Sequence, residues 1–228
     1  MSRLYLTCGL LLAAVLLGAG NAAAQGWVGR GGPRPGAIEV SGGGTWSAGE
    51  DLGQRAATLT PNPGSGSSSF DLFQTDQKLK SVFGGKALVG YYITRAFAIE
   101  GGFHYSRPTL SVELSDDFEG APSLTATTSI TQYLFTGSAV YHFGKSPSVV
   151  PFVAVGAGHL RDVHNGNELV ETGVEYHGNF GVKWWSGSGR GRIGVRAEGG
   201  VSMRTGVFDF DEDSRAVPTA AVSLAYLF

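Results

Sequence analysis

Five histidines are the side chains of this sequence that are best suited to acid–base catalysis: His104, His142, His159, His164 and His177. A histidine beside a serine and a carboxylate can serve as the general base of a hydrolase, but the three groups must converge in space. No local nucleophile motif marks a serine in this chain. We therefore predict no catalytic residues, and we interpret His104 and His177 more simply as polar side chains inside the fold.

Two further segments match binding motifs only in part. Residues 189–194 fit the spacing G-x-G-x-x-G, but a dinucleotide site needs a strand before the glycines and a helix after them. Here a turn precedes the motif and a strand is predicted to follow it. Residues 209–213 resemble the start of a calcium loop without its glycine and distal glutamate, so we interpret them as a solvated acidic loop. A weak surface site for a divalent cation is the alternative, and the sequence predicts neither a cofactor nor a resident metal.

The elements that must position these residues are strands, because apolar side chains recur at every second position along the chain. Most of these segments exceed the ~9–11 residues with which a tilted strand crosses a membrane. We predict an all-β fold of eight antiparallel strands at 37–46, 79–93, 97–107, 125–143, 149–160, 172–185, 191–203 and 216–228.

The predicted connections alternate between short turns and long loops, as in an up-and-down transmembrane β-barrel with short periplasmic turns and long external loops. The short turns are 94–96, 144–148 and 186–190. The long loops are 47–78, 108–124, 161–171 and 204–215.

The alternating rows differ in polarity, which raises the question of which row faces inward. In the segment 193–201, Ile193 and Val195 alternate with Arg196 and Glu198. A soluble lipocalin-like barrel would place the polar row outside. The uninterrupted apolar row at the end of the chain, in 220–228, favours the opposite arrangement, with apolar residues facing lipid.

The first residues have the pattern of a secretory signal peptide, which also favours a membrane barrel. Arg3 supplies a basic start, residues 4–17 are apolar, and the small residues 22–24 form a cleavage site. We predict a signal peptide at 1–24, a flexible periplasmic leader at 25–36 and an outer-membrane barrel at 37–228. Cleavage would remove Cys8 and leave 16 basic against 19 acidic residues, a net charge of −3. No basic patch stands out, so we expect no nucleic-acid partner.

Charged residues on the predicted inner rows suggest a network inside the barrel. Of the 19 acidic residues, 15 fall in the four long loops, and the other four all fall on inner rows. Four basic residues share those rows, and unpaired charges in a dry interior would be costly. The expected polar network consists of Glu39, Lys86, Glu100, His104, Glu175, His177, Lys183, Arg192, Arg196 and Glu198. Four basic residues near the outer strand ends, Lys80, Arg107, Arg161 and Arg204, are expected to form a rim that meets lipid phosphates.

Several segments together resemble one family. Residues 84–95 followed by 97–105 are similar to its second hairpin, and residues 151–158 are similar to its fifth strand. The chain resembles the small eight-stranded bacterial outer-membrane β-barrels of the outer-membrane protein A transmembrane-domain and opacity-protein type. The resemblance implies the outer membrane as location. It also implies that Tyr226 and the terminal Phe228 act as the signal read by the barrel-assembly machinery.

Eight strands enclose an interior just wide enough for side chains to fill it. We therefore expect a non-enzymatic barrel with a plugged lumen that presents acidic extracellular loops, for envelope integrity or surface interaction. A narrow or gated small-solute channel is one alternative, and a lipid-modifying outer-membrane enzyme is another. Outer-membrane lipids and the assembly machinery are the expected partners, and the identity of an extracellular ligand stays open.

Overall fold

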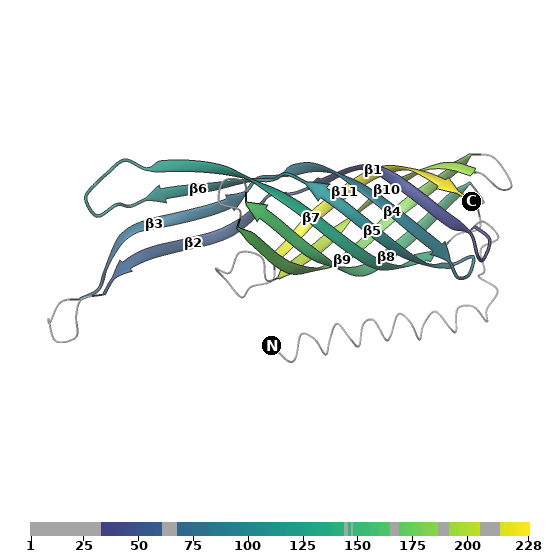
Figure 1. Cartoon of the computed structure of the whole chain (residues 1–228), viewed down its shortest axis with the longest axis horizontal. Coiled ribbons are helices and arrows are strands. Elements are labelled where there is room, and N and C mark those ends of the chain that lie inside the picture. Colours follow the sequence, from purple (N-terminus) through teal and green to yellow (C-terminus); the bar gives the residue numbers. More distant parts are fainter. Residues whose placement is uncertain are drawn as a thin grey trace.

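The computed structural model describes residues 33–60, 68–143, 146, 148–164, 169–186, 192–205 and 215–228. All of its regular structure in these ranges is β-strand (Figure 1). The eleven strands are β1 (Ile38–Ser47), β2 (Glu50–Leu59), β3 (Phe70–Leu79), β4 (Val82–Tyr92), β5 (Phe97–Ser106), β6 (Thr109–Ser115), β7 (Leu124–His142), β8 (Val149–His164), β9 (Val170–Ser186), β10 (Arg192–Thr205) and β11 (Arg215–Leu227). The predicted signal peptide lies outside the described residues.

Eight of these strands close into a barrel in which every neighbouring pair is antiparallel. Their order around the barrel is β1, β4, β5, β7, β8, β9, β10 and β11. The last strand pairs with the first, with Leu227 opposite Glu39 and Ala220 opposite Trp46. This confirms the predicted fold class, and the eight predicted strands correspond to these eight elements (Figure 1).

The other three strands form a feature that the sequence did not predict. Strands β2, β3 and β6 pair in that order, and β6 pairs with the first residues of β7, at 124–129. The result is a four-stranded sheet, here called the extension sheet, that projects from one end of the barrel (Figure 1). The predicted loops 47–78 and 108–124 are therefore wrong in part, because Glu50–Leu59, Phe70–Leu79 and Thr109–Ser115 are strands that pair with one another and with the start of β7 beyond the barrel.

Two further predicted boundaries are corrected at the same end of the barrel. Strand β8 runs on to His164 and β9 begins at Val170, so most of the predicted loop 161–171 is strand. Asp162 lies in this ladder, opposite Glu171. The physical reason is the same as for the extension sheet: polar side chains do not interrupt a ladder whose backbone groups are all paired.

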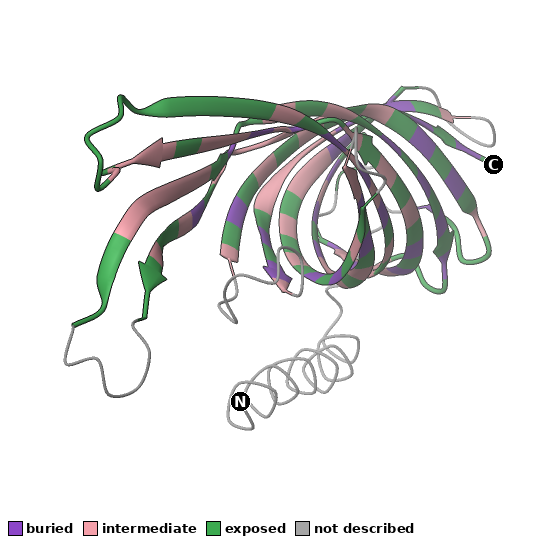
Figure 2. Ribbon diagram, turned by 60° about the vertical axis from the view of Figure 1, so that its left-hand side comes forward, coloured by how far each residue is buried: buried purple, intermediate pink, exposed green. Residues whose placement is uncertain are grey.

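Exposure alternates along the barrel strands, with apolar residues outside. In β11, Val222, Leu224 and Tyr226 are exposed, whereas Ser223 and Ala225 between them are buried. Figure 2 shows this alternation along the barrel wall. The charged side chains of the inner rows are buried within the barrel, so the apolar-out arrangement expected from the sequence is that of the structure.

Two apolar clusters fill the ends of the interior. The first lies near the C-terminus and includes Tyr92, Phe152, Trp185 and Leu227. The second lies where the extension sheet leaves the barrel and joins Leu52, Leu79 and Leu110 of that sheet to Ile130, Leu134 and Leu160 of the barrel. The second cluster ties the base of the extension sheet to the barrel wall.

Candidate functional site

The interior of the barrel is the candidate site, because most of its charged side chains are paired there in three successive layers. The layer nearest the C-terminus is built from β1, β4, β7 and β9. Lys183 Nζ lies 2.7 Å from Glu39 Oε2, and the Tyr92 hydroxyl donates to the same oxygen at 2.5 Å. Lys183 also donates to the Tyr92 hydroxyl at 3.1 Å, and His142 Nε2 lies 3.3 Å from that hydroxyl.

The middle layer is centred on Arg196 of β10. Its NH1 donates to Glu100 Oε2 at 2.5 Å, and its NH2 lies 2.6 Å from Glu198 Oε2. Lys86 pairs with the other oxygen of Glu198. The guanidinium carbon of Arg196 lies 4.6 Å from the centre of the Phe152 ring, and the side chain of Arg196 is only 2% exposed. The layer therefore ties β10 to β4 and β5 across the lumen.

The third layer lies towards the extension sheet and corrects one predicted role. Arg204 was expected in the outer basic rim, but its Nε donates to Glu175 at 3.0 Å and its NH1 donates to Glu50 at 2.6 Å. The reason is strand parity: Arg204 shares the inner row of β10 with Arg196. Glu50 was predicted to be a loop acid, and it lies at the start of β2 as a partner of this inner arginine.

The other three rim residues lie on the outer side of the barrel wall or at its edge. Lys80, Arg107 and Arg161 are all exposed. Arg161 is the cross-strand partner of Tyr133, whose ring centre lies 5.6 Å from that of Tyr105. Basic and tyrosine side chains thus lie side by side on this outer surface.

Two further members of the predicted network, Arg192 and His104, lie near these layers. Arg192 packs against the Trp185 ring, with its guanidinium carbon 5.7 Å from the ring centre. His104 is half-buried and lines a cavity of about 70 Å³ on the extension side of the middle layer, together with Lys86 and Arg196. A cavity of this size has room for about two water molecules.

A serine and two of the predicted network residues form the one arrangement of the described interior that resembles a catalytic group. Ser138 Oγ lies 2.8 Å from Nε2 of His177, and Nδ1 of His177 lies 3.8 Å from Glu175. A triad requires a hydrogen bond between histidine and carboxylate, which 3.8 Å does not allow, and Glu175 is held by Arg204 instead. We therefore interpret the contact between Ser138 and His177 as a structural hydrogen bond along the inner side of the barrel wall.

The contact between Ser138 and His177 depends on a glycine of β8, the strand that lies between β7 and β9. Gly156 of β8 lies opposite Ser138 of β7 on one side and His177 of β9 on the other. A Cβ at Gly156 would lie 2.6 Å from His177 Nε2 and 2.7 Å from Ser138 Oγ. The sequence could not identify Ser138 as the partner of His177, because that pairing follows from the register of three strands.

We expect Gly156→Ala to destabilise the barrel by about 1–3 kcal/mol, because the added methyl group overpacks the inner wall. Thermal or urea unfolding of the detergent-purified protein measures the effect. Gly137→Ala is the matched control, since a Cβ at Gly137 of β7 meets no atom within 4 Å. Equal stability of the two variants would contradict the assignment of Gly156.

Buried polar residues that the sequence analysis missed include Asp162, which is 1% exposed. Gln132 Nε2 donates to its carboxylate at 3.4 Å, and Ser106 donates to Gln132 at 3.2 Å. The signal for Tyr92, His142 and Gln132 was present in the alternation of β4 and β7, because all three fall on inner rows.

The two partial binding motifs of the sequence lie mostly outside the residues that the structure describes. Among the described residues, no group of three or more histidine, cysteine or acidic side chains is arranged to hold a metal ion. The acidic segment 209–213 and residues 189–191 of the glycine motif lie outside the described residues. No helix within the described ranges is long and apolar enough to span a membrane.

Comparison with known families decides what kind of barrel this is. The family described as the outer membrane protein beta-barrel domain matches residues 9–206. The chain belongs to this family. The membership agrees with the apolar outer wall and the closed ring of eight strands, and it places the protein in the outer membrane.

Solved structures of outer-membrane barrels are similar to this member of the family in fold. OprG from Pseudomonas aeruginosa is 12% identical, with a TM-score of 0.52 over 86% of this chain and 98% of OprG. Neisserial surface protein A is 14% identical, with a TM-score of 0.49 over 85% of this chain and 98% of its own. Ail, the attachment invasion locus protein of Yersinia pestis, is 14% identical, with a TM-score of 0.45 over 85% and 99%. A search of the curated proteins gave no match.

Proposed function

We propose that this family member is a non-enzymatic outer-membrane protein with a plugged lumen that displays its acidic extension sheet outside the cell. The observation that carries the proposal is the middle layer of the interior, where Arg196 is held by both Glu100 and Glu198. A hydrated solute that crossed the barrel would have to separate these buried charges. Separating them leaves charges uncompensated in a medium of low dielectric constant, which is costly.

The outer surface supports a role at the membrane boundary. Arg107 and Arg161, with Tyr105 and Tyr133 beside Arg161, combine the guanidinium and tyrosine groups that suit a lipid interface. We propose that Lys80, Arg107 and Arg161 bind lipid phosphates at this level. The extension sheet then projects beyond the phosphates into the surroundings of the cell.

The test of the plugged lumen is electrical. The purified full chain in planar lipid bilayers is expected to give no steady open-channel current, with a water-filled general porin as positive control. Any steady conductance would contradict the proposal, and a value well below that of the general porin would favour the narrow-channel alternative. Brief current transients without a stable open level do not indicate an open pore and agree with the proposal.

A further inference from the structure

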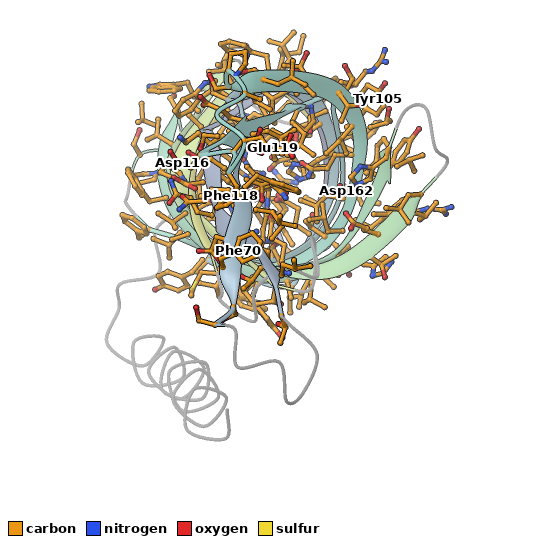
Figure 3. All side chains as sticks on the ribbon, turned by 90° about the vertical axis from the view of Figure 1, so that its left-hand side faces the viewer. Phe70, Tyr105, Asp116, Phe118, Glu119 and Asp162 are labelled. Atoms are coloured by element: carbon orange, nitrogen blue, oxygen red, sulfur yellow. The ribbon has the colours of Figure 1, made fainter. Side chains whose placement is uncertain are left out.

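The far end of the extension sheet carries an exposed apolar patch, here called the tip patch, of Leu59, Phe70 and Phe118. Phe118 is 69% exposed, Leu59 48% and Phe70 39%. Leu59 lies opposite Phe70 in the β2–β3 ladder, and the ring centres of Phe70 and Phe118 are 4.8 Å apart. Figure 3 looks onto this end and shows Phe70 and Phe118 with Asp116 and Glu119 around them. Clustered apolar side chains at such a position mark an interaction surface.

The tip patch is held in place by hydrogen bonds. Phe118 N donates to the carbonyl oxygen of Leu72 at 2.8 Å, which fixes the turn between β6 and β7 against β3. Within that turn, Gly120 N donates to the carbonyl oxygen of Asp117 at 2.9 Å, and Ala121 N donates to the Asp117 carboxylate at 3.2 Å. Aromatic side chains that are already ordered lose little conformational entropy on binding.

The charge around the tip patch is negative only. Residues 56–77 and 113–124 contain no lysine, arginine or histidine. The acidic residues of these segments are Asp71, Asp76, Glu113, Asp116, Asp117 and Glu119. Asp76 is paired with Lys78 at 2.7 Å, so the negative charge around the tip patch comes from the other five acidic residues. Such a surface repels anionic lipid, nucleic acid and sulfated sugars.

We propose that the tip patch binds a cationic amphipathic polypeptide segment of another molecule. Its apolar side chains would pack on Phe70 and Phe118, and its lysine or arginine side chains would meet Asp116 and Glu119. Because the acidic residues lie in water, the charge pairing mainly steers and selects the partner, while the aromatic rings supply most of the affinity. The inference rests on the proposed function in one respect, that the extension sheet faces the outside.

Binding is tested with the purified full chain in detergent and a fluorescently labelled synthetic peptide of leucine and lysine. We expect saturable binding that weakens when the ionic strength is raised from about 0.05 to about 0.5 M. Replacing Phe70→Ser and Phe118→Ser together should weaken binding roughly tenfold or more. Leu124→Ser is the matched control, since it removes another exposed apolar side chain of the same sheet, and it should leave the affinity within about twofold.

Two further measurements make the test decisive. Asp116→Asn with Glu119→Gln should weaken binding and reduce its dependence on salt. A peptide of leucine and glutamate, or vesicles of an anionic phospholipid, should not bind. The proposal is overturned if the leucine–lysine peptide does not bind, if the double-serine variant binds as well as the wild type, or if the anionic probes bind equally. These readouts are independent of conductance, so the tip patch and the plugged lumen can fail separately.

Discussion

Arg196→Ala is expected to destabilise the folded barrel by about 3–5 kcal/mol, because removal of one partner leaves a buried charge without compensation. Glu100 would lose the guanidinium that lies 2.5 Å away, whereas Glu198 would keep Lys86. The penalty therefore falls mainly on Glu100. Urea unfolding in detergent or lipid vesicles, followed by tryptophan fluorescence or by the heat-dependent shift in gel mobility, measures the change.

Removing both partners separates a charge effect from a simple loss of packing. Arg196→Met keeps a similar volume but leaves Glu100 uncompensated, so the double variant Arg196→Met with Glu100→Gln should be clearly more stable than Arg196→Met alone. Glu198 remains paired with Lys86 in both variants. If the double variant is as unstable as the single one, the middle layer is held by packing and the charge network is not its main support.

Deletion of Phe228 is expected to leave the protein secreted, with only a minor fraction inserted as a barrel in the outer membrane. Phe228 N donates to the carbonyl oxygen of Ile38 at 2.9 Å, where β11 meets β1. Its ring packs edge-on against Tyr226, with the ring centres 4.7 Å apart. We propose that this aromatic end is what the assembly machinery reads, so its loss acts on assembly. Fractionation of cells and the heat-dependent mobility shift measure the inserted fraction.

Refolding in vitro is the control for this second prediction. Without the assembly machinery, the deletion removes one hydrogen bond and part of one ring contact, so the purified variant should refold with a loss of only about 1 kcal/mol. Phe228→Tyr keeps an aromatic end and should insert in cells as the wild type does. Wild-type insertion of the deletion variant, or failure of both variants to refold in vitro, would show that the end has no specific role in assembly.

The sequence predicted the barrel well because a lipid-facing wall imposes a strict period of two over long segments. The row of Val222, Leu224 and Tyr226 shows this period without interruption. The extension sheet was missed because one of its faces is polar and its strands are rich in acidic residues, which we interpreted as loops. Leu110, Val112 and Leu114 of β6 alternate in the same way and were the available signal.

Partners across the lumen could not be predicted in the same way. Alternation placed Lys183 and Glu39 on inner rows, but their contact joins residues 144 positions apart and depends on the stagger of all the strands between them. Arg204 shows the opposite error, since its position near a strand end suggested the rim while its parity placed it inside. The side of the barrel wall that a residue faces follows from the local sequence, whereas its partner across the lumen is a property of the closed barrel.

The extension sheet also has a mechanical consequence, because its backbone is continuous with the barrel wall. Strand β7 runs without interruption for 19 residues, from the extension sheet into its ladder with β8. At about 3.3 Å per residue, the ten-residue strands β2 and β3 extend up to about 33 Å. A pull on the tip would load the β7–β8 ladder along the strand direction, so that many hydrogen bonds share the force.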